Sequence, residues 1–272
     1  MFLHPPPQLC CNIATLRWMS TTITRATKRS KKKKTTMFNT IWPFATNQSI
    51  LPRVPNAGAI FCVEKPGFLG PIRPENHHET REVAFVGRSN VGKSSLVGAL
   101  FKQPHMVRSS KTPGRTRDTL FFALGDRTHL SFPFILVDLP GYGYARVAKN
   151  EQEEWEKKME IYLKTRSIEQ LTRVFVLLDA RRDGMTERDI GMAEFLNVHN
   201  VPFQFVLTKC DAVHSKEVER VAAKVIDEAW SYQHCVRELI AVSAQKDRGL
   251  SELREAALRS TGYSGKSGGK KK

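Results

Sequence analysis

The first 63 residues contain no acidic residue, although the chain of 272 residues has 27 of them. Nine lysines and arginines lie in that stretch, and the first carboxylate is Glu64. The last ten residues add four lysines and again no acid. Residues 64–262 hold 30 basic against 27 acidic residues, so most of the formal net charge of +16 belongs to the two ends. The middle of the chain has the charge balance of an ordinary folded domain.

Regularly spaced cysteines and long apolar runs are also missing. No C-x-x-C pattern occurs, which excludes a cysteine zinc site and a disulfide framework of the usual spacing. No apolar stretch reaches the roughly 20 residues of a membrane span, so no membrane association is expected. The five cysteines are scattered, at Cys10, Cys11, Cys62, Cys210 and Cys235.

The acid-free, Ser/Thr-rich opening with spaced arginines favours a mitochondrial presequence over residues 1–34. The run "KRSKKKK" also fits a permanent basic arm on nucleic acid, or a nuclear signal. The first two roles can coexist if cleavage falls before Lys28. We expect residues 35–79 to be an extended Pro-rich segment, 80–262 the folded domain and 263–272 a flexible basic tail.

Strands and helices are predicted to alternate along the folded domain, which indicates an α/β fold, a three-layer domain with a mostly parallel sheet. Continuous apolar runs predict the strands, and apolar residues at helical spacing predict the helices. The expected strands are 81–86, 118–124, 129–139, 172–179, 201–209 and 238–244. The expected helices are 92–101, part of 140–166, 185–199 with Thr186 as its cap, 215–230 and 249–258.

The stretch "GRSNVGKSS" fits the pattern G-x-x-x-x-G-K-[ST], a loop whose backbone N–H groups wrap a pyrophosphate. It follows a predicted strand and opens a predicted helix, whose N-terminus favours an anion. The predicted phosphate-binding residues are Gly87, Arg88, Ser89, Asn90, Val91, Gly92, Lys93, Ser94 and Ser95. Lys93 is expected to reach the β- and γ-phosphates and to have no packing role.

A second stretch, "VDLPG", places Asp138 at the end of an apolar strand. A carboxylate there can hold Mg²⁺ through water, beside the hydroxyl of Ser94. The backbone N–H of Gly141 is free to sense a γ-phosphate. A Pro-Gly turn after any strand would look similar, so this stretch depends on the others.

Two further stretches select the base. "TKCD" places Asp211 where one carboxylate can accept from both guanine donors, with the stem of Lys209 along the base. "VSAQK" includes Ser243, and the N–H of Ala244 could reach the guanine 6-oxo group. Adenine would leave the Asp211 carboxylate unpaired, and polar sites of this kind reject such a mismatch strongly. The two stretches together predict guanine.

These motifs make the chain resemble the EngB family of TRAFAC-class GTPases over roughly residues 80–260. The stretches of sequence most specific to this family are "KTPGRT" and "DLPGYGYA". The resemblance implies a GTP-hydrolysing switch, with Mg²⁺, that assists assembly of the large ribosomal subunit. With a presequence, it implies the mitochondrial matrix, and as partners mitochondrial large-subunit rRNA, ribosomal proteins and other assembly factors, for a protein monomeric when free. It also makes Thr116 the switch threonine, a ligand of Mg²⁺ and the γ-phosphate, although Thr112 and Thr119 are close.

Two positions depart from other GTPases. Thr208 stands where many carry asparagine, and it offers a hydroxyl but no amide to tie strands together. Tyr142 stands where Ras-like proteins carry the glutamine that orients the attacking water. Intrinsic hydrolysis should therefore be slow and depend on a partner or on K⁺. Asn90 accompanies K⁺ dependence in related GTPases, and it could equally stabilise the loop as an Asx turn.

Two other functions fit the same nucleotide site. One is a GTPase outside ribosome assembly, for instance in tRNA modification or septation. No added RNA-modifying domain is recognisable, which argues against the tRNA role. The other is a nucleotide-loaded RNA-binding scaffold with negligible turnover.

Overall fold

The computed structural model describes residues 39–41, 81–102, 119–126, 131–142, 149–166 and 169–262. All of them belong to the compact unit Met37–Lys272. The expectations for the presequence, for most of the Pro-rich segment, for Thr112 and Thr116 and for the basic tail lie outside these residues.

The described strands form one sheet in the order β1-β7-β6-β5-β2-β4-β3. Every pairing is parallel except that of β3 with β4 at one edge. The prediction of a mostly parallel sheet is therefore confirmed. The strands are β1 (Asn39–Ile41), β2 (Glu82–Gly87), β3 (Leu120–Asp126), β4 (Ser131–Asp138), β5 (Leu171–Asp179), β6 (Phe203–Thr208) and β7 (Glu238–Ala241).

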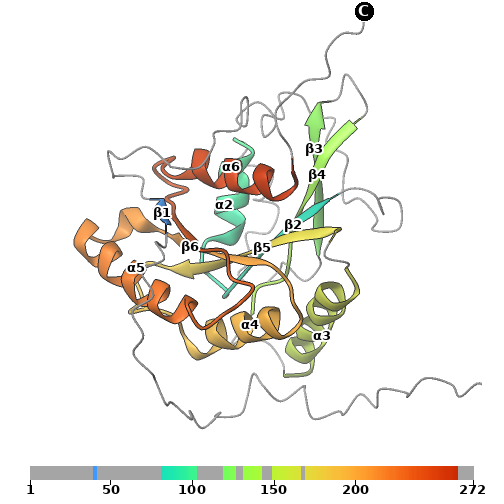
Figure 1. The fold of residues 1–272 in the computed structure, drawn as a ribbon, viewed down its shortest axis with the longest axis horizontal. Coiled ribbons are helices and arrows are strands. Elements are labelled where there is room, and N and C mark those ends of the chain that lie inside the picture. The colour runs from blue at the N-terminus through green and yellow to red at the C-terminus, as the bar shows by residue number, and fades with distance from the viewer. Residues whose placement is uncertain are drawn as a thin grey trace, which may run out of the picture. The chain divides into compact units, whose positions relative to one another are not determined.

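Helices cover both faces of this sheet. Figure 1 shows α2 and α6 on one face and α3, α4 and α5 on the other, which gives the three layers expected from the sequence. The described helices are α2 (Lys93–Leu100), α3 (Lys149–Thr165), α4 (Glu187–Val198), α5 (Ser215–Ala229) and α6 (Leu250–Ser260), with a short 3-10 turn, η4 (Cys210–Ala212). Among the described residues, no helix has the length and apolarity needed to cross a membrane.

The edge strand β1 was not predicted. Its three residues pair in parallel with Glu238–Ile240 of β7. They lie in the Pro-rich segment, for which the sequence indicated only an extended arm. A three-residue strand carries no periodicity that sequence analysis could detect, since strand patterns need four or more residues.

The central strands are buried on both faces, which explains why they read as continuous apolar runs. All six residues of β2 and all six of β6 are buried. Phe85 of β2 stacks on Phe175 of β5, with 5.0 Å between ring centroids. On the face covered by α2 and α6, Leu96 and Leu253 join the same core as Phe85.

Local sequence signals explain where the helices begin. The predicted cap at Thr186 is confirmed, because Thr186 and Asp189 form a capping box at the start of α4. Such a box satisfies N–H groups that the first turn cannot pair. In α5, helical spacing places apolar side chains on one buried face: Val218, Val221, Ala222, Val225 and Ala229.

The parallel arrangement brings separate motifs to one edge of the sheet. Strands β2, β4, β5 and β6 end at Gly87, Asp138, Asp179 and Thr208, respectively. In open α/β sheets, ligands bind beyond the carboxyl ends of the strands. We call this edge, with the loops that follow these strands, the carboxyl edge.

Candidate functional site

The loop between β2 and α2 has the backbone shape of an anion cradle. Gly92 is the N-cap of α2 and has φ 98°, and Asn90 also has a positive φ of 64°. Left-handed residues beside right-handed ones turn successive N–H groups toward one point. A glycine is needed at Gly92, because a side chain with that φ would be strained.

Packing explains the first glycine of the loop. A Cβ at Gly87 would lie 2.9 Å from Cγ1 of Val91, closer than a Cβ normally approaches another atom, and a tight 3.0 Å from Cβ of Leu177. Of the remaining predicted residues, Ser94 is half-buried and Ser95 exposed in the first turn of α2. The N–H of Ser89 is engaged by the Tyr142 carbonyl at 2.9 Å.

Lys93 and Asp138 form a buried ion pair at the centre of the carboxyl edge. Lys93 is 6% exposed and Asp138 is fully buried. The expectation that Lys93 has no packing role is wrong, because its ammonium neutralises a carboxylate that water cannot reach. The two residues are 45 positions apart, so only the fold brings them together.

The second oxygen of Asp138 suits the metal that this class of site needs. Oδ2 is buried and, within the described part of the chain, has no hydrogen-bond partner. The described residues also contain no cluster of three or more His, Cys, Asp or Glu side chains for a metal. Mg²⁺ fits such a place, because it binds through one or two carboxylates, water and substrate phosphates rather than an all-protein cage.

Asp138 and the hydroxyl of Ser94 would hold this Mg²⁺, together with Thr116, which lies outside the described residues. When bound, Mg²⁺ would supply the positive charge that neutralises the phosphates of the nucleotide.

The stretch "TKCD", which we call the base motif, links the phosphate loop to the sheet through Thr208 and Lys209. The Thr208 hydroxyl lies 2.7 Å from the Val91 carbonyl and 3.0 Å from the Leu178 carbonyl. Its single proton can go to either oxygen. The expectation that threonine cannot tie these segments together is therefore wrong, since the hydroxyl links β6 to the loop and to β5.

Lys209 makes the adjacent connection. Its Nζ donates to the Asn90 carbonyl and lies 3.0 Å from Oδ2 of Asp179. Its Cε is 3.3 Å from where a Cβ on Gly92 would stand, so its stem crosses the phosphate loop. The backbone of Lys209 has φ 57°, a conformation that residues other than glycine rarely adopt.

Asp179, at the end of β5, is a site residue that sequence analysis missed. Burial raises its pKa, but hydrogen bonds from Arg181 and Lys209 outweigh that effect and bring the pKa to about 2. Arg181 grips the carboxylate with Nε at 2.9 Å and a terminal nitrogen at 2.7 Å. The signal that could have found it is its place directly after an apolar strand, at the same edge as Asp138.

The predicted base readers lie together in the next two loops. Asp211 lies in η4, where its Oδ1 accepts a hydrogen bond from the Ser243 hydroxyl at 2.5 Å. Ser243 Oγ in turn accepts from the Lys246 N–H at 3.0 Å. Ala244 follows directly and is half-buried. These contacts hold the Asp211 carboxylate in one orientation.

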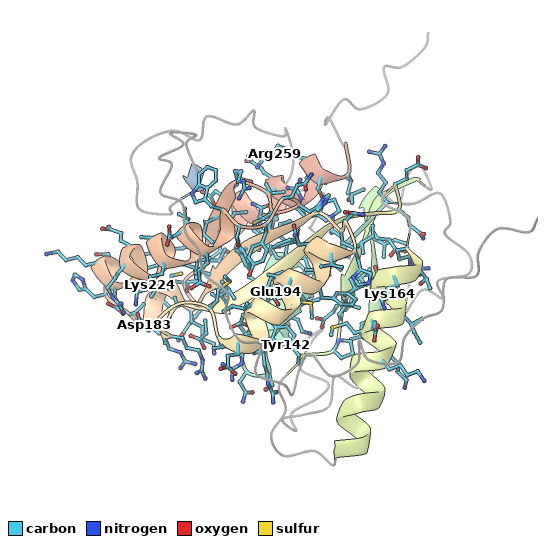
Figure 2. All side chains as sticks on the ribbon, turned by 60° about the horizontal axis from the view of Figure 1, so that its bottom comes forward. Tyr142, Lys164, Asp183, Glu194, Lys224 and Arg259 are labelled. Atoms are coloured by element: carbon cyan, nitrogen blue, oxygen red, sulfur yellow. The ribbon has the colours of Figure 1, made fainter. Side chains whose placement is uncertain are left out.

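Tyr142, the residue after "DLPG", contacts the phosphate loop through its backbone and α4 through its phenol. Its N–H donates to the Gly87 carbonyl at 3.2 Å, which keeps Gly141 beside the loop. Its phenol donates to Oδ1 of Asp189 at 2.8 Å, and Figure 2 labels this tyrosine beside α4. Burial raises the pKa of Tyr142 well above its usual range, and Asp189 adds to the rise. A phenol that is 2% exposed and already bonded does not hold an attacking water.

The strand–loop–helix cradle, the buried lysine–aspartate pair and the base motif at one edge of a mostly parallel sheet define the class: a P-loop GTPase fold. A family model described as "50S ribosome-binding GTPase" matches residues 82–209. Solved structures give the same fold. A crystal structure of EngB aligns with TM-score 0.53 and 19% identity, covering 66% of this chain and 98% of that one. Era in complex with MgGDPNP and a 16S rRNA fragment also gives 0.53, at 23% identity, covering 66% of this chain and 56% of that one.

Curated relatives narrow the class to one family. The protein "Probable GTP-binding protein EngB" of Rhizobium etli is 39% identical over 199 residues, 72% of this chain and 87% of the relative. The EngB of Caulobacter vibrioides is 40% identical over 206 residues, covering 75% and 86%. That of Hyphomonas neptunium is 42% identical over 173 residues, covering 64% and 76%. The chain belongs to the EngB family of GTPases, enzymes that bind GTP and GDP with Mg²⁺ and hydrolyse GTP.

Proposed function

We propose that this protein is a GTP-hydrolysing assembly factor for the large subunit of the mitochondrial ribosome and works in the mitochondrial matrix. The description of the matching family model names 50S ribosome binding, which supports the large-subunit part. The acid-free, basic first 63 residues support the mitochondrial part. Its partners in this proposal are large-subunit rRNA, ribosomal proteins and other assembly factors.

One observation carries the nucleotide chemistry. Among the described residues, the buried Lys93–Asp138 pair leaves Asp138 Oδ2 without a partner, beside a glycine loop that Thr208 and Lys209 hold in place. In this proposal, Lys93 moves its ammonium to the β- and γ-phosphates when nucleotide binds. Asp138 would then hold Mg²⁺, and the charge of the bound ion would replace that of the lysine, so that no buried charge is left unpaired.

The other residues have the following roles in the proposed mechanism. The loop residues 87–95 hold the phosphates, and Asp211, with Ser243 and Ala244, reads guanine. Thr116 and the Gly141 N–H meet the γ-phosphate. The proposed mechanism hydrolyses GTP slowly without help, because the buried Tyr142 supplies no water-orienting group. Either the ribosomal particle or K⁺ bound near Asn90 then supplies what is missing.

The basic ends are proposed to dock on rRNA, since residues 64–262 have a net charge of only +3. Each phosphate contact steepens the log–log salt dependence of binding by about 0.7–0.9. Deleting 266–272, with its four lysines, should flatten the slope by roughly two to four units while GTP affinity stays the same. An unchanged slope would show that this tail does not touch RNA.

Affinity purification from mitochondria tests the function directly. Tagged protein loaded with a non-hydrolysable GTP analogue should recover large-subunit rRNA and ribosomal proteins, and the GDP-loaded protein should recover far less. Recovery of a tRNA-modifying complex instead would contradict the proposal. Single-turnover GTP hydrolysis with and without large-subunit particles separates a GTPase from a scaffold, because a scaffold shows no stimulated turnover.

A further inference from the structure

Gly141–Tyr142, at the end of the stretch that begins with "VDLPG", is attached to the domain at three points. The Tyr142 N–H donates to the Gly87 carbonyl at 3.2 Å, and the Tyr142 carbonyl accepts from the Ser89 N–H at 2.9 Å. The phenol provides the third point through Asp189. Gly141 is consequently so close to the phosphate loop that a Cβ on it would lie 3.3 Å from the Gly87 carbonyl oxygen.

Asp189 is a rigid anchor for that phenol. Its other oxygen, Oδ2, accepts from the backbone N–H of Thr186 at 2.9 Å and from the Thr186 hydroxyl at 2.6 Å. The residue is 3% exposed, and one turn further along α4 Met192 is fully buried against the core. The carboxylate thus cannot follow the tyrosine if the tyrosine moves. The hydrogen bond fixes the ring relative to α4, and the backbone bonds fix Gly141 relative to the ring.

We propose that Tyr142 and Asp189 are positioning residues for GTP, which hold the Gly141 N–H where it meets the γ-phosphate. The inference rests on the proposed function, in which Gly141 senses that phosphate. GDP has no γ-phosphate, so the contact adds nothing to GDP binding. The bond between Tyr142 and Asp189 therefore sets the preference for GTP over GDP, and not the affinity for guanine nucleotides in general.

The chain contains a matched control at the opposite edge of the sheet. Tyr162 is also a buried tyrosine whose hydroxyl donates to a buried carboxylate, Oε2 of Glu82, at 2.6 Å. Burial raises its pKa well above the usual range, and Glu82 adds to the rise, as Asp189 does for Tyr142. Glu82 begins β2, whereas the phosphate loop follows its other end. Removing either hydroxyl deletes the same kind of bond, but only one of the two lies beside the nucleotide.

The experiment compares the full-length wild type with Tyr142→Phe, Asp189→Asn and Tyr162→Phe. The dissociation constants for GDP and for a non-hydrolysable GTP analogue are measured, together with the Tm and single-turnover hydrolysis. We expect Tyr142→Phe and Asp189→Asn to weaken binding of the analogue roughly tenfold, the order of one charge-assisted hydrogen bond. Binding of GDP should change less than twofold. Hydrolysis should slow in both. Tyr162→Phe should lower the Tm comparably and leave both affinities unchanged.

Three outcomes would overturn the inference. In the first, Tyr142→Phe keeps the wild-type ratio of the two affinities and only loses Tm, as Tyr162→Phe does. In the second, Tyr142→Phe lowers the affinities for GDP and for the analogue by the same factor. In the third, the ratio changes in Tyr162→Phe as well. The wild-type measurements report separately on the proposed function, which fails if the wild type binds neither guanine nucleotide.

Discussion

Buried carboxylates are paired differently at the two ends of the strands, the carboxyl edge and the opposite end, which we call the amino edge. At the amino end of β2, the buried Glu82 accepts from Tyr162 at 2.6 Å, from Arg166 at 3.2 Å and from Gln170 at 3.2 Å. At the carboxyl edge, the buried Asp138 is bonded through one oxygen to Lys93, and its other oxygen has no partner among the described residues. The first cluster is complete by itself, and the second becomes complete only with a ligand.

A second cluster at the amino edge is paired less completely than the first. Glu238 of β7 accepts from Gln204 at 2.8 Å and from Arg259 at 3.2 Å. Arg173 donates to Gln204 at 2.9 Å, and its buried Nε lacks a partner in the described structure. Burial lowers the pKa of Arg173, and the charge of Glu238 opposes that effect.

Positive φ values are not confined to the carboxyl edge, because Lys102, after α2, and Asn200, before β6, have them too. Asn90 and Lys209, whose positive φ values are unusual for side-chain-bearing residues, both lie at the carboxyl edge and contact each other. Strained residues persist where the surroundings hold them, and they gather at ligand sites. The difference between the edges lies in the pairing of the two carboxylates, since Glu82 is paired through both oxygens and Asp138, among the described residues, through one.

The largest expected effect comes from Lys93→Ala. Nucleotide binding should be abolished, because the variant lacks the cation that the loop directs at the phosphates. The ion pair adds a second consequence, since Asp138 is left buried and uncompensated, at about 3–5 kcal/mol of unfolding free energy. Urea denaturation and GTP binding measure the two effects. Submicromolar GTP affinity in the variant would rule out the phosphate-loop assignment.

Asp138→Asn in the Lys93→Ala background serves as the control for that prediction. It removes the unpaired charge and should restore much of the lost stability without restoring nucleotide binding.

Asp211→Asn should change which base is bound. The amide loses the acceptor pair for guanine and offers a donor to the 2-oxo group of xanthine. GTP affinity should fall at least about a hundredfold, because a polar site is left mispaired, while XTP affinity rises. Competition binding with both nucleotides provides the measurement. Unchanged GTP binding would mean that Asp211 does not read the base.

Glu82→Gln tests the amino edge, where a substitution should lower stability without changing nucleotide affinity. The amide keeps the shape of the side chain but removes the negative charge to which Arg166 and Tyr162 donate hydrogen bonds. We expect a loss of about 1.5–3 kcal/mol of unfolding free energy, the range for hydrogen bonds to a charged group. Affinities for GDP and GTP should stay within twofold of wild type. A fivefold change in either affinity would break the division between the two edges.

Asp179→Asn should give the smallest effect. Its carboxylate holds Lys209 over the phosphate loop, so we expect both GDP and GTP to bind about threefold to tenfold more weakly, equally for the two nucleotides. A selective loss of GTP would instead place Asp179 in the switch.

The same variant has a pH signature. The folded-state pKa of Asp179 is lowered from 3.8 to about 2, so the stability that its ionised form adds is present above pH 4. That contribution is lost as pH falls through the folded pKa of about 2. Wild type and Asp179→Asn should therefore converge in unfolding free energy between about pH 4 and pH 2, as measured by urea denaturation at each pH. Parallel curves over that window would contradict the assignment.

Much of the fold could be predicted because it depends on local signals. The buried strands read as apolar runs, the capping residue of α4 is visible at Thr186, and the loop "GRSNVGKSS" and the base motif have fixed spacing. The partners of the motif residues could not be predicted. Asp179 with Lys209 and Tyr142 with Asp189 meet 30 and 47 residues apart in sequence, through side chains of common types. Such pairings are decided by the packing of the sheet and helices, which no single stretch of sequence encodes.

The most direct test of the central claim makes one protein depend on one nucleotide. Asp211→Asn protein is incubated with mitochondrial large-subunit particles in excess GTP, with or without a non-hydrolysable XTP analogue, and sedimented. The account predicts that the variant co-sediments with the particles only when the XTP analogue is present, and that XDP does not replace it. Co-sedimentation that is the same with the analogue, with XDP and with no xanthine nucleotide would contradict the claim that the carboxyl edge of this sheet is a nucleotide switch for the ribosome.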